Sequence, residues 1–261
     1  MHWDSFVTDI SLAVVPVDGQ TRSGKEVFDV APQDHVHRAR MATLLGGERR
    51  LGHSDLSRAA TSYFSEATKL LLNHGAAVYT PFEGDTRLGR RVILRAAVPA
   101  GAKRNTSLPT LDIRLSKNRA EQVARARQAL RAMRLPPLPV QGADGLPTHW
   151  IDIEGWTEAQ NALVLEGTRD LGGHVGGRLT DSITHYYYAV RLLRTAAFLQ
   201  ELRQVIAQRL NGWLAFTGAL ETAVALTISG LPTREEVEAA QSALAAGKGP
   251  FSEILAPFMG R

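Results

Sequence analysis

Cysteine is absent from the 261-residue chain. This absence excludes a disulfide scaffold, a thiol nucleophile and every metal site built on thiolates. The first residues carry no basic and apolar leader, and no apolar run is long enough to span a bilayer. The sequence therefore predicts a cytoplasmic protein with no membrane partner. Hydrophobic residues make up 44% of the chain, which is enough for a packed core and argues against global disorder.

Lysine is scarce. Of 30 basic residues only five are lysine, and the net charge of +4 is carried mainly by 25 arginines. Arginine binds phosphate groups bidentately and stacks on bases, so this bias is typical of a protein that binds nucleic acid. Codon usage in a GC-rich genome is the alternative explanation, and the arginines bear on function only where they cluster.

Nucleotide, metal and hydrolase signatures are also missing. The chain contains no P-loop, no H-E-x-x-H zinc motif, no EF-hand loop and no G-x-S-x-G nucleophile elbow. These absences argue against an NTPase, a zincin, a calcium sensor and an α/β-hydrolase, and no cofactor or metal is expected.

The order of apolar runs and turn signals predicts an α+β fold. The N-terminal part, residues 1–135, has the βαββαβ order of a ferredoxin-like module, with one extra strand and one early helix. A strand at 149–154 can complete its sheet. The expected strands are 6–17, 25–30, 76–82, 90–98 and 111–115, and the expected helices are 33–45, 55–73 and 116–134.

A proline-rich linker over residues 136–145 separates this module from a partial second α/β module at residues 146–261. Capping-box patterns, Thr157 with Gln160 and Thr233 with Glu236, predict the starts of two helices. Between them, the sequence predicts a long helix at 184–210 and strands at 213–216 and 222–228.

The helix expected over residues 117–134 has one apolar and one basic face. At 100° per residue, Val123, Ala126, Leu130 and Met133 share a face. The opposite arc of the helix carries a nearly pure basic stripe. Such a stripe can follow a phosphate backbone, because each neutralised phosphate releases a counterion. An ordinary solvated surface is the alternative. The basic residues of the opposite arc are Lys117, Arg125, Arg127, Arg131 and Arg134.

Histidines and arginines alternate in the segment DHVHRAR, residues 34–40. RNA cleavage without metal needs a proton acceptor for the 2′-hydroxyl and a cation for the phosphate, and histidine and arginine suit these roles. We therefore expect His37 to act as base and Arg38 to steady the phosphate, with Arg40 near His37 on a helix. A polar start of a helix is the alternative.

Two further segments could carry chemistry. The glycine-rich turn GGHVGGR, residues 172–178, would let the backbone approach a phosphate beside Arg178. A flexible connection between two helices is the alternative for this turn. Asp152 and Glu154 would face the same side of a strand, where paired carboxylates can bind Mg²⁺ or exchange protons. The exposed face of an edge strand is the alternative for this pair.

The ferredoxin-like order, the arginine-lined helix, the glycine-rich turn and the lack of a cofactor motif together resemble the RAMP proteins of CRISPR systems in outline. The turn differs from that family's pattern, because it precedes the long helix instead of lying near the end of the chain. The resemblance implies binding of guide RNA within a multi-subunit ribonucleoprotein and, in some members, metal-independent RNA processing. A structural or assembly subunit and a Mg²⁺-dependent nuclease using Asp152 and Glu154 are the alternatives.

Overall fold

A computed structural model defines the fold. It describes residues 3–12, 14–17, 20–23, 26–46, 56–86, 89–97, 104–132, 152–172, 181–220 and 223–259. The helices in these segments are α1 (Trp3–Ser11), α2 (His35–Leu44), α3 (Leu56–His74), α4 (Lys117–Ala132), α5 (Ile153–Thr168), the 3₁₀ helix η1 (Arg169–Leu171), α6 (Asp181–Thr217), α7 (Arg234–Ala245) and α8 (Phe251–Met259). The strands are β1 (Val14–Val17), β2 (Gln20–Ser23), β3 (Val27–Ala31), β4 (Ala76–Thr86), β5 (Gly89–Arg95), β6 (Leu111–Arg114) and β7 (Ala225–Ser229).

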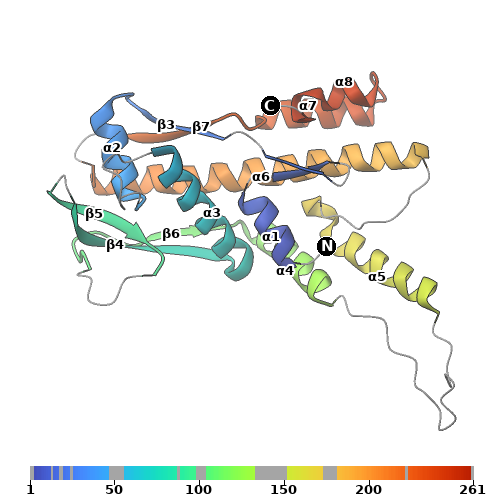
Figure 1. Ribbon diagram of the computed structural model, residues 1–261, viewed down its shortest axis with the longest axis horizontal. Coiled ribbons are helices and arrows are strands. Elements are labelled where there is room, and N and C mark those ends of the chain that lie inside the picture. The colour runs from blue at the N-terminus through green and yellow to red at the C-terminus, as the bar shows by residue number, and fades with distance from the viewer. Residues whose placement is uncertain are drawn as a thin grey trace, which may run out of the picture.

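Helix α6 is the spine of the molecule. Its 37 residues give it a length of about 56 Å. Figure 1 shows β3, β7, α7 and α8 along one side of α6, and α1, α3, α4 and the sheet of β4, β5 and β6 along the other. Because elements from both ends of the chain pack on α6, the main hydrophobic core contains residues from both expected modules, including Phe64, Ile113, Leu202 and Leu226.

The strands form small antiparallel sheets. β4 lies between β5 and β6 in a three-stranded sheet, β1 pairs with β2, and β3 pairs with β7. The mixed helix-and-sheet class predicted from the sequence is confirmed. A ferredoxin-like arrangement is not confirmed, because no sheet among the described strands has four members.

Several elements follow directly from local sequence signals. Alternation in β6 buries Leu111 and Ile113 and exposes Asp112 and Arg114. Gly75, with a φ of +76°, ends α3. The capping box of Thr233 and Glu236 is present at the start of α7, with both reciprocal hydrogen bonds formed.

The strand predicted at 6–17 is confirmed only at its end, where residues 14–17 form β1. Residues 6–11 belong to α1, because Phe6, Val7 and Ile10 have helical spacing and are buried with Trp3 on one face. The strand expected at 25–30 does form, as β3. However, it pairs with β7, some 200 residues away, instead of with the N-terminal segment.

Three predictions near the second module also fail. Asp152 caps α5, and Glu154 lies in its first turn, so the expected strand at 149–154 does not extend through these residues. Thr157 is inside that helix, where its hydroxyl donates to the carbonyl of Ile153. Residues 213–216 continue α6, since Trp213 and Leu214 extend its buried face. The expected linker, 136–145, lies outside the described residues.

A buried arginine joins four elements. The guanidinium of Arg203 on α6 pairs with Glu26 before β3 (Nε to Oε1, 2.5 Å), and the two side chains are 3% and 8% exposed. It also donates to the hydroxyl of Thr68 on α3 at 2.5 Å and to the carbonyl of Ser11 at the end of α1 at 3.2 Å. Its planar group lies 5.8 Å from the ring centroid of Phe64.

None of the described helices is both long and apolar enough to cross a membrane.

Replacing Arg203 with leucine should lower the free energy of unfolding by about 3–5 kcal/mol, because it leaves the buried Glu26 carboxylate without its cation. Urea denaturation followed by circular dichroism measures this change. The double variant Arg203→Leu with Glu26→Leu should recover part of the loss, since no unpaired charge remains. Arg234→Ala, which removes an exposed ion pair to Glu238, is the control and should change stability little. A loss no larger than that of the control would contradict the prediction.

Candidate nucleic-acid interface

Helix α4 is fixed on the body of the protein by its apolar face. Val123, Ala126, Ala129 and Leu130 are buried, which confirms the expected apolar face, although Met133 lies outside the described residues. At the start of α4, Ser116 Oγ accepts from the Arg119 amide at 3.4 Å, as expected for a capping residue.

The basic residues of α4 divide into two groups. Lys117, Arg125 and Arg131 are exposed, and Arg125 forms an exposed ion pair with Asp170 at 3.2 Å. Arg127 is half-buried, and its Nη1 donates to the carbonyl of Asn73 near the C-terminus of α3. A cation is favourable there because it complements the helix dipole. Arg134 lies outside the described residues.

Arg119 has a structural role that the sequence analysis missed. Its Nε donates to Glu201 Oε2 of α6 at 3.0 Å, and its guanidinium lies 5.4 Å from the ring centroid of Phe198. On a helical wheel, Arg119 falls on the apolar side beside Val123 and Leu130. That position could have identified it as an arginine that points to the protein interior.

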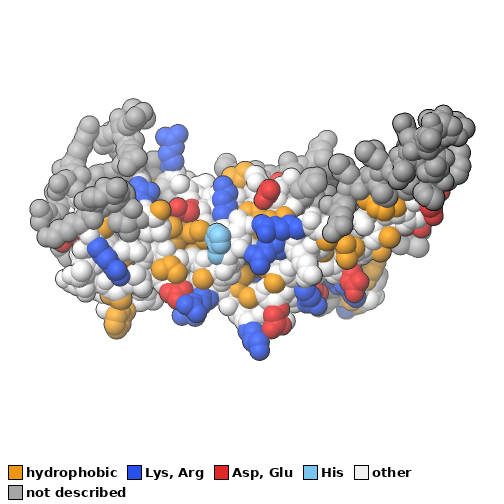
Figure 2. All heavy atoms as spheres, turned by 90° about the horizontal axis from the view of Figure 1, so that it is seen from below, with side chains coloured by type: hydrophobic (Ala, Val, Ile, Leu, Met, Phe, Trp, Pro, Cys, Tyr) orange, Lys and Arg blue, Asp and Glu red, His pale blue; other side chains and the backbone are white. Residues whose placement is uncertain are grey.

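The face of the protein shown in Figure 2 carries basic, acidic and hydrophobic side chains side by side. Figure 2 shows Lys and Arg side chains spread over the described part of the face seen from below, with acidic and hydrophobic side chains between them. The nearly pure basic stripe expected from the helical wheel is therefore wrong in detail, because Arg127 is used to bind α3 and Arg125 has an acidic neighbour. A smaller set of exposed cations remains on α4.

His37 and Arg38 each contact a different carboxylate. Asp34 caps α2 by accepting from the His37 amide at 2.8 Å, and its second carboxylate oxygen is hydrogen-bonded to the His37 ring. These hydrogen bonds, that of the amide above all, hold the pKa of the Asp34 carboxyl below its usual value. Arg38 pairs with Asp29 of β3 at 2.5 Å. The two residues expected to share one phosphate are thus held by separate local partners.

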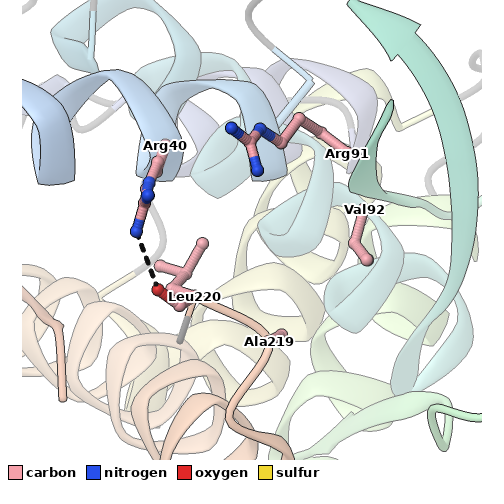
Figure 3. Close-up of a pocket in the computed structure, with 5 residues that line it drawn as sticks. All are labelled: Arg40, Arg91, Val92, Ala219 and Leu220. Carbon is pink, nitrogen blue, oxygen red and sulfur yellow. Dashed lines mark hydrogen bonds between the residues drawn. The ribbon is translucent and has the colours of Figure 1, made fainter. Parts of the chain in front are cut away.

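Arg40 lies at a pocket. Its Nη1 donates to the carbonyl of Leu220, just after α6, at 3.3 Å. The same pocket is lined by Arg91 and Val92 of β5 and by Ala219 (Figure 3). The sequence analysis did not single out Arg91, and no local pattern marks it.

The glycine-rich turn and the acidic pair have other roles where they are described. Gly172, with a φ of +74°, packs against α6, and its carbonyl accepts from the buried Arg191 at 2.8 Å. Arg178 lies outside the described residues. Asp152 Oδ1 accepts from the Gly155 amide as a helix cap, so the two carboxylates are not paired on a strand. The described part of the chain contains no group of three or more His, Asp or Glu side chains that could hold a metal.

Gly172→Ala should destabilise the protein for two reasons. Its left-handed backbone conformation disfavours a side chain by about 1–3 kcal/mol, and an added Cβ would lie 2.2 Å from Thr195 Oγ1. Gly218 also has a positive φ, but a Cβ there meets nothing within 4 Å. Thermal unfolding should therefore show a larger loss for Gly172→Ala than for Gly218→Ala. Equal losses would mean that packing against α6 is not the constraint.

The cap of α2 should be pH-dependent. Because the folded-state pKa of Asp34 is lowered from its usual 3.8, the stability that its carboxylate adds is complete above pH ~4 and is lost as the pH falls through that lowered value. Asp34→Asn, which retains an N-cap, should have a lower Tm than the parent protein at neutral pH, and the gap should narrow below pH ~4. Melting curves over this range test the idea, and a gap that does not vary with pH would refute it.

Comparisons with known proteins do not bear on this interface. No protein-family model matches the chain, and no curated protein matches its sequence. The functional case is therefore built from the residues of the chain itself.

Proposed function

We propose that the protein is an RNA-binding subunit of a ribonucleoprotein and that RNA phosphates bind along the exposed face of α4. The observation that carries this proposal is the row of exposed cations Lys117, Arg125 and Arg131, with Glu121 the one acidic residue on the described length of that helix. The ferredoxin-like module expected from the sequence is not required for it.

The row has a spacing that suits a nucleic-acid strand. At 1.5 Å per residue, Lys117 and Arg131 are about 21 Å apart along the helix axis, with Arg125 between them. A strand of several nucleotides can therefore contact all three cations. Arginine at two of the three positions supplies planar, bidentate donors for phosphate oxygens.

The helix that presents the row is held rigidly. Arg119 binds Glu201 of α6, and Arg127 binds the carbonyl of Asn73 at the end of α3. Because these arginines fix α4 on two neighbouring helices, little conformational freedom would be lost on binding. The arginines of α4 thus support the proposal in two ways, as anchors and as exposed cations.

We propose binding alone, without the cleavage that His37 and Arg38 were expected to perform. The His37 ring is hydrogen-bonded to Asp34, and Arg38 is paired with Asp29. These local contacts give both residues a role in fixing α2 and β3. They favour a structural function over a catalytic one.

A purely structural or assembly role has less support. The apolar circumference of α6 suggested from the sequence that this helix is buried against another protein. In the structure, β6, β7, α3, α7 and α8 of the same chain pack on it. The apolarity of α6 therefore needs no partner to explain it, although the subunits of the proposed ribonucleoprotein would still contact the protein elsewhere.

Reversing the three exposed charges tests the proposal. The variant with Lys117→Glu, Arg125→Glu and Arg131→Glu should bind single-stranded RNA of about 20 nucleotides, longer than a typical site, at least tenfold more weakly. Loss of three phosphate contacts should also reduce the slope of log K against log salt by about 2. Fluorescence anisotropy over a range of salt concentrations measures both quantities.

The control variant reverses the same number of charges elsewhere, with Arg209→Glu, Arg234→Glu and Lys248→Glu. All three residues are exposed on or near α6 and α7, and the control should retain RNA binding. An equal loss in both variants would show that net charge alone is responsible. Failure of the parent protein to bind RNA would refute the proposal, and tighter binding of single-stranded DNA of the same sequence would refute the choice of RNA.

A further inference from the structure

A second basic site lies away from α4, between α2, β5 and the turn that follows α6. It is a pocket of about 30 Å³ that is partly open to solvent. Figure 3 shows Arg91 extending from β5 toward α2, and Arg40 descending from α2 to the carbonyl of Leu220. The remaining lining residues, Val92 and Ala219, contribute apolar side chains.

The pocket concentrates positive charge. Two of its five lining residues are arginines from different elements, and none of the five is acidic. Glu83 of β4 lies opposite Val92 in the sheet register, but it does not line the pocket. The described walls therefore supply hydrogen-bond donors and cationic charge without a carboxylate.

Arg91 has an unsatisfied donor. Its Nε is shielded from solvent and has no hydrogen-bond partner. Leaving a buried donor unpaired is unfavourable, and more so when the donor belongs to a charged group. Arg95, four positions further along the same strand, donates to the carbonyl of Gly46 at 3.1 Å. The missing acceptor is therefore particular to Arg91.

The geometry selects the kind of acceptor. Nε and one Nη form the edge through which a guanidinium binds two oxygens of an oxyanion side by side. A water molecule needs roughly 10–15 Å³ of cavity volume, so the pocket has room for about two oxygen atoms, with the rest of the ligand toward solvent. A phosphate monoester carries a charge of about −1.5 to −2 at neutral pH and three strong acceptor oxygens, so it attracts the Arg91 guanidinium more strongly than a carboxylate does.

We propose that this pocket binds a single phosphate group, with two oxygens on the side-on edge of Arg91 and with Arg40 beside them. Arg40 is oriented by the Leu220 carbonyl, so the site is largely formed before the ligand arrives. The phosphate is either a terminal phosphate of RNA or free inorganic phosphate. This inference does not depend on RNA binding by α4.

Isothermal titration of the full chain with inorganic phosphate tests the site. Arg91→Gln should weaken phosphate binding at least tenfold, because it removes the bidentate donor edge, and Arg40→Gln should also weaken it. Arg95→Gln removes the same charge from the same strand outside the pocket, and it should bind like the parent protein. Circular dichroism of each variant verifies that the fold is retained. The α4 charge-reversal variant should still bind phosphate, which separates the two proposals.

A second arm distinguishes the two sources of phosphate. An RNA with a 5′-phosphate that binds more tightly than the same RNA with a 5′-hydroxyl, in the parent protein but not in Arg91→Gln, identifies an RNA end. Phosphate binding without this difference identifies the free anion. Two results would overturn the proposal. They are no binding of either ligand, or an equal loss of binding in Arg95→Gln.

Discussion

The constraint on which the structure depends most is the placement of one arginine in the interior. Arg203 is 3% exposed and joins Glu26, Thr68 and the end of α1 to the spine helix α6. A guanidinium in an apolar core is unfavourable unless its donors are satisfied. The elements that supply acceptors must therefore lie where they do. This requirement fixes α1, α3 and the start of β3 against α6, and the apolar contacts fill the space around that frame.

Arginine serves two purposes elsewhere in the fold. Arg119, Arg127 and Arg191 bind acceptors on neighbouring elements, and they act as connections between helices. Lys117, Arg125 and Arg131 face solvent. The total of 25 arginines therefore overstates the charge available to a polyanion, since part of it is used inside the molecule.

Local patterns predicted the elements whose cause is local. The alternation in β6, the glycine after α3 and the capping box of α7 each act within a few residues, and all three are present in the structure. Short apolar runs were ambiguous, because residues 6–11 and 213–216 read equally well as strand or helix until their neighbours are known. Partners distant in sequence could not be predicted. The contact of Arg127 with Asn73 and the unsatisfied Nε of Arg91 depend on how separate elements pack, so the candidate site was predicted only in part.

The pairing of β3 with β7 has a consequence for the order of events during synthesis. Val27 lies opposite Ser229, so about 200 residues must be made before β3 has its partner. Until then, the N-terminal part of the nascent chain holds an open strand edge, which is the kind of edge that pairs with other chains. Contacts this distant also slow folding, because a long loop must close before they can form. The protein is therefore expected to complete its fold late, after β7 has left the ribosome, and a chain that ends before residue 225 would leave this edge unprotected.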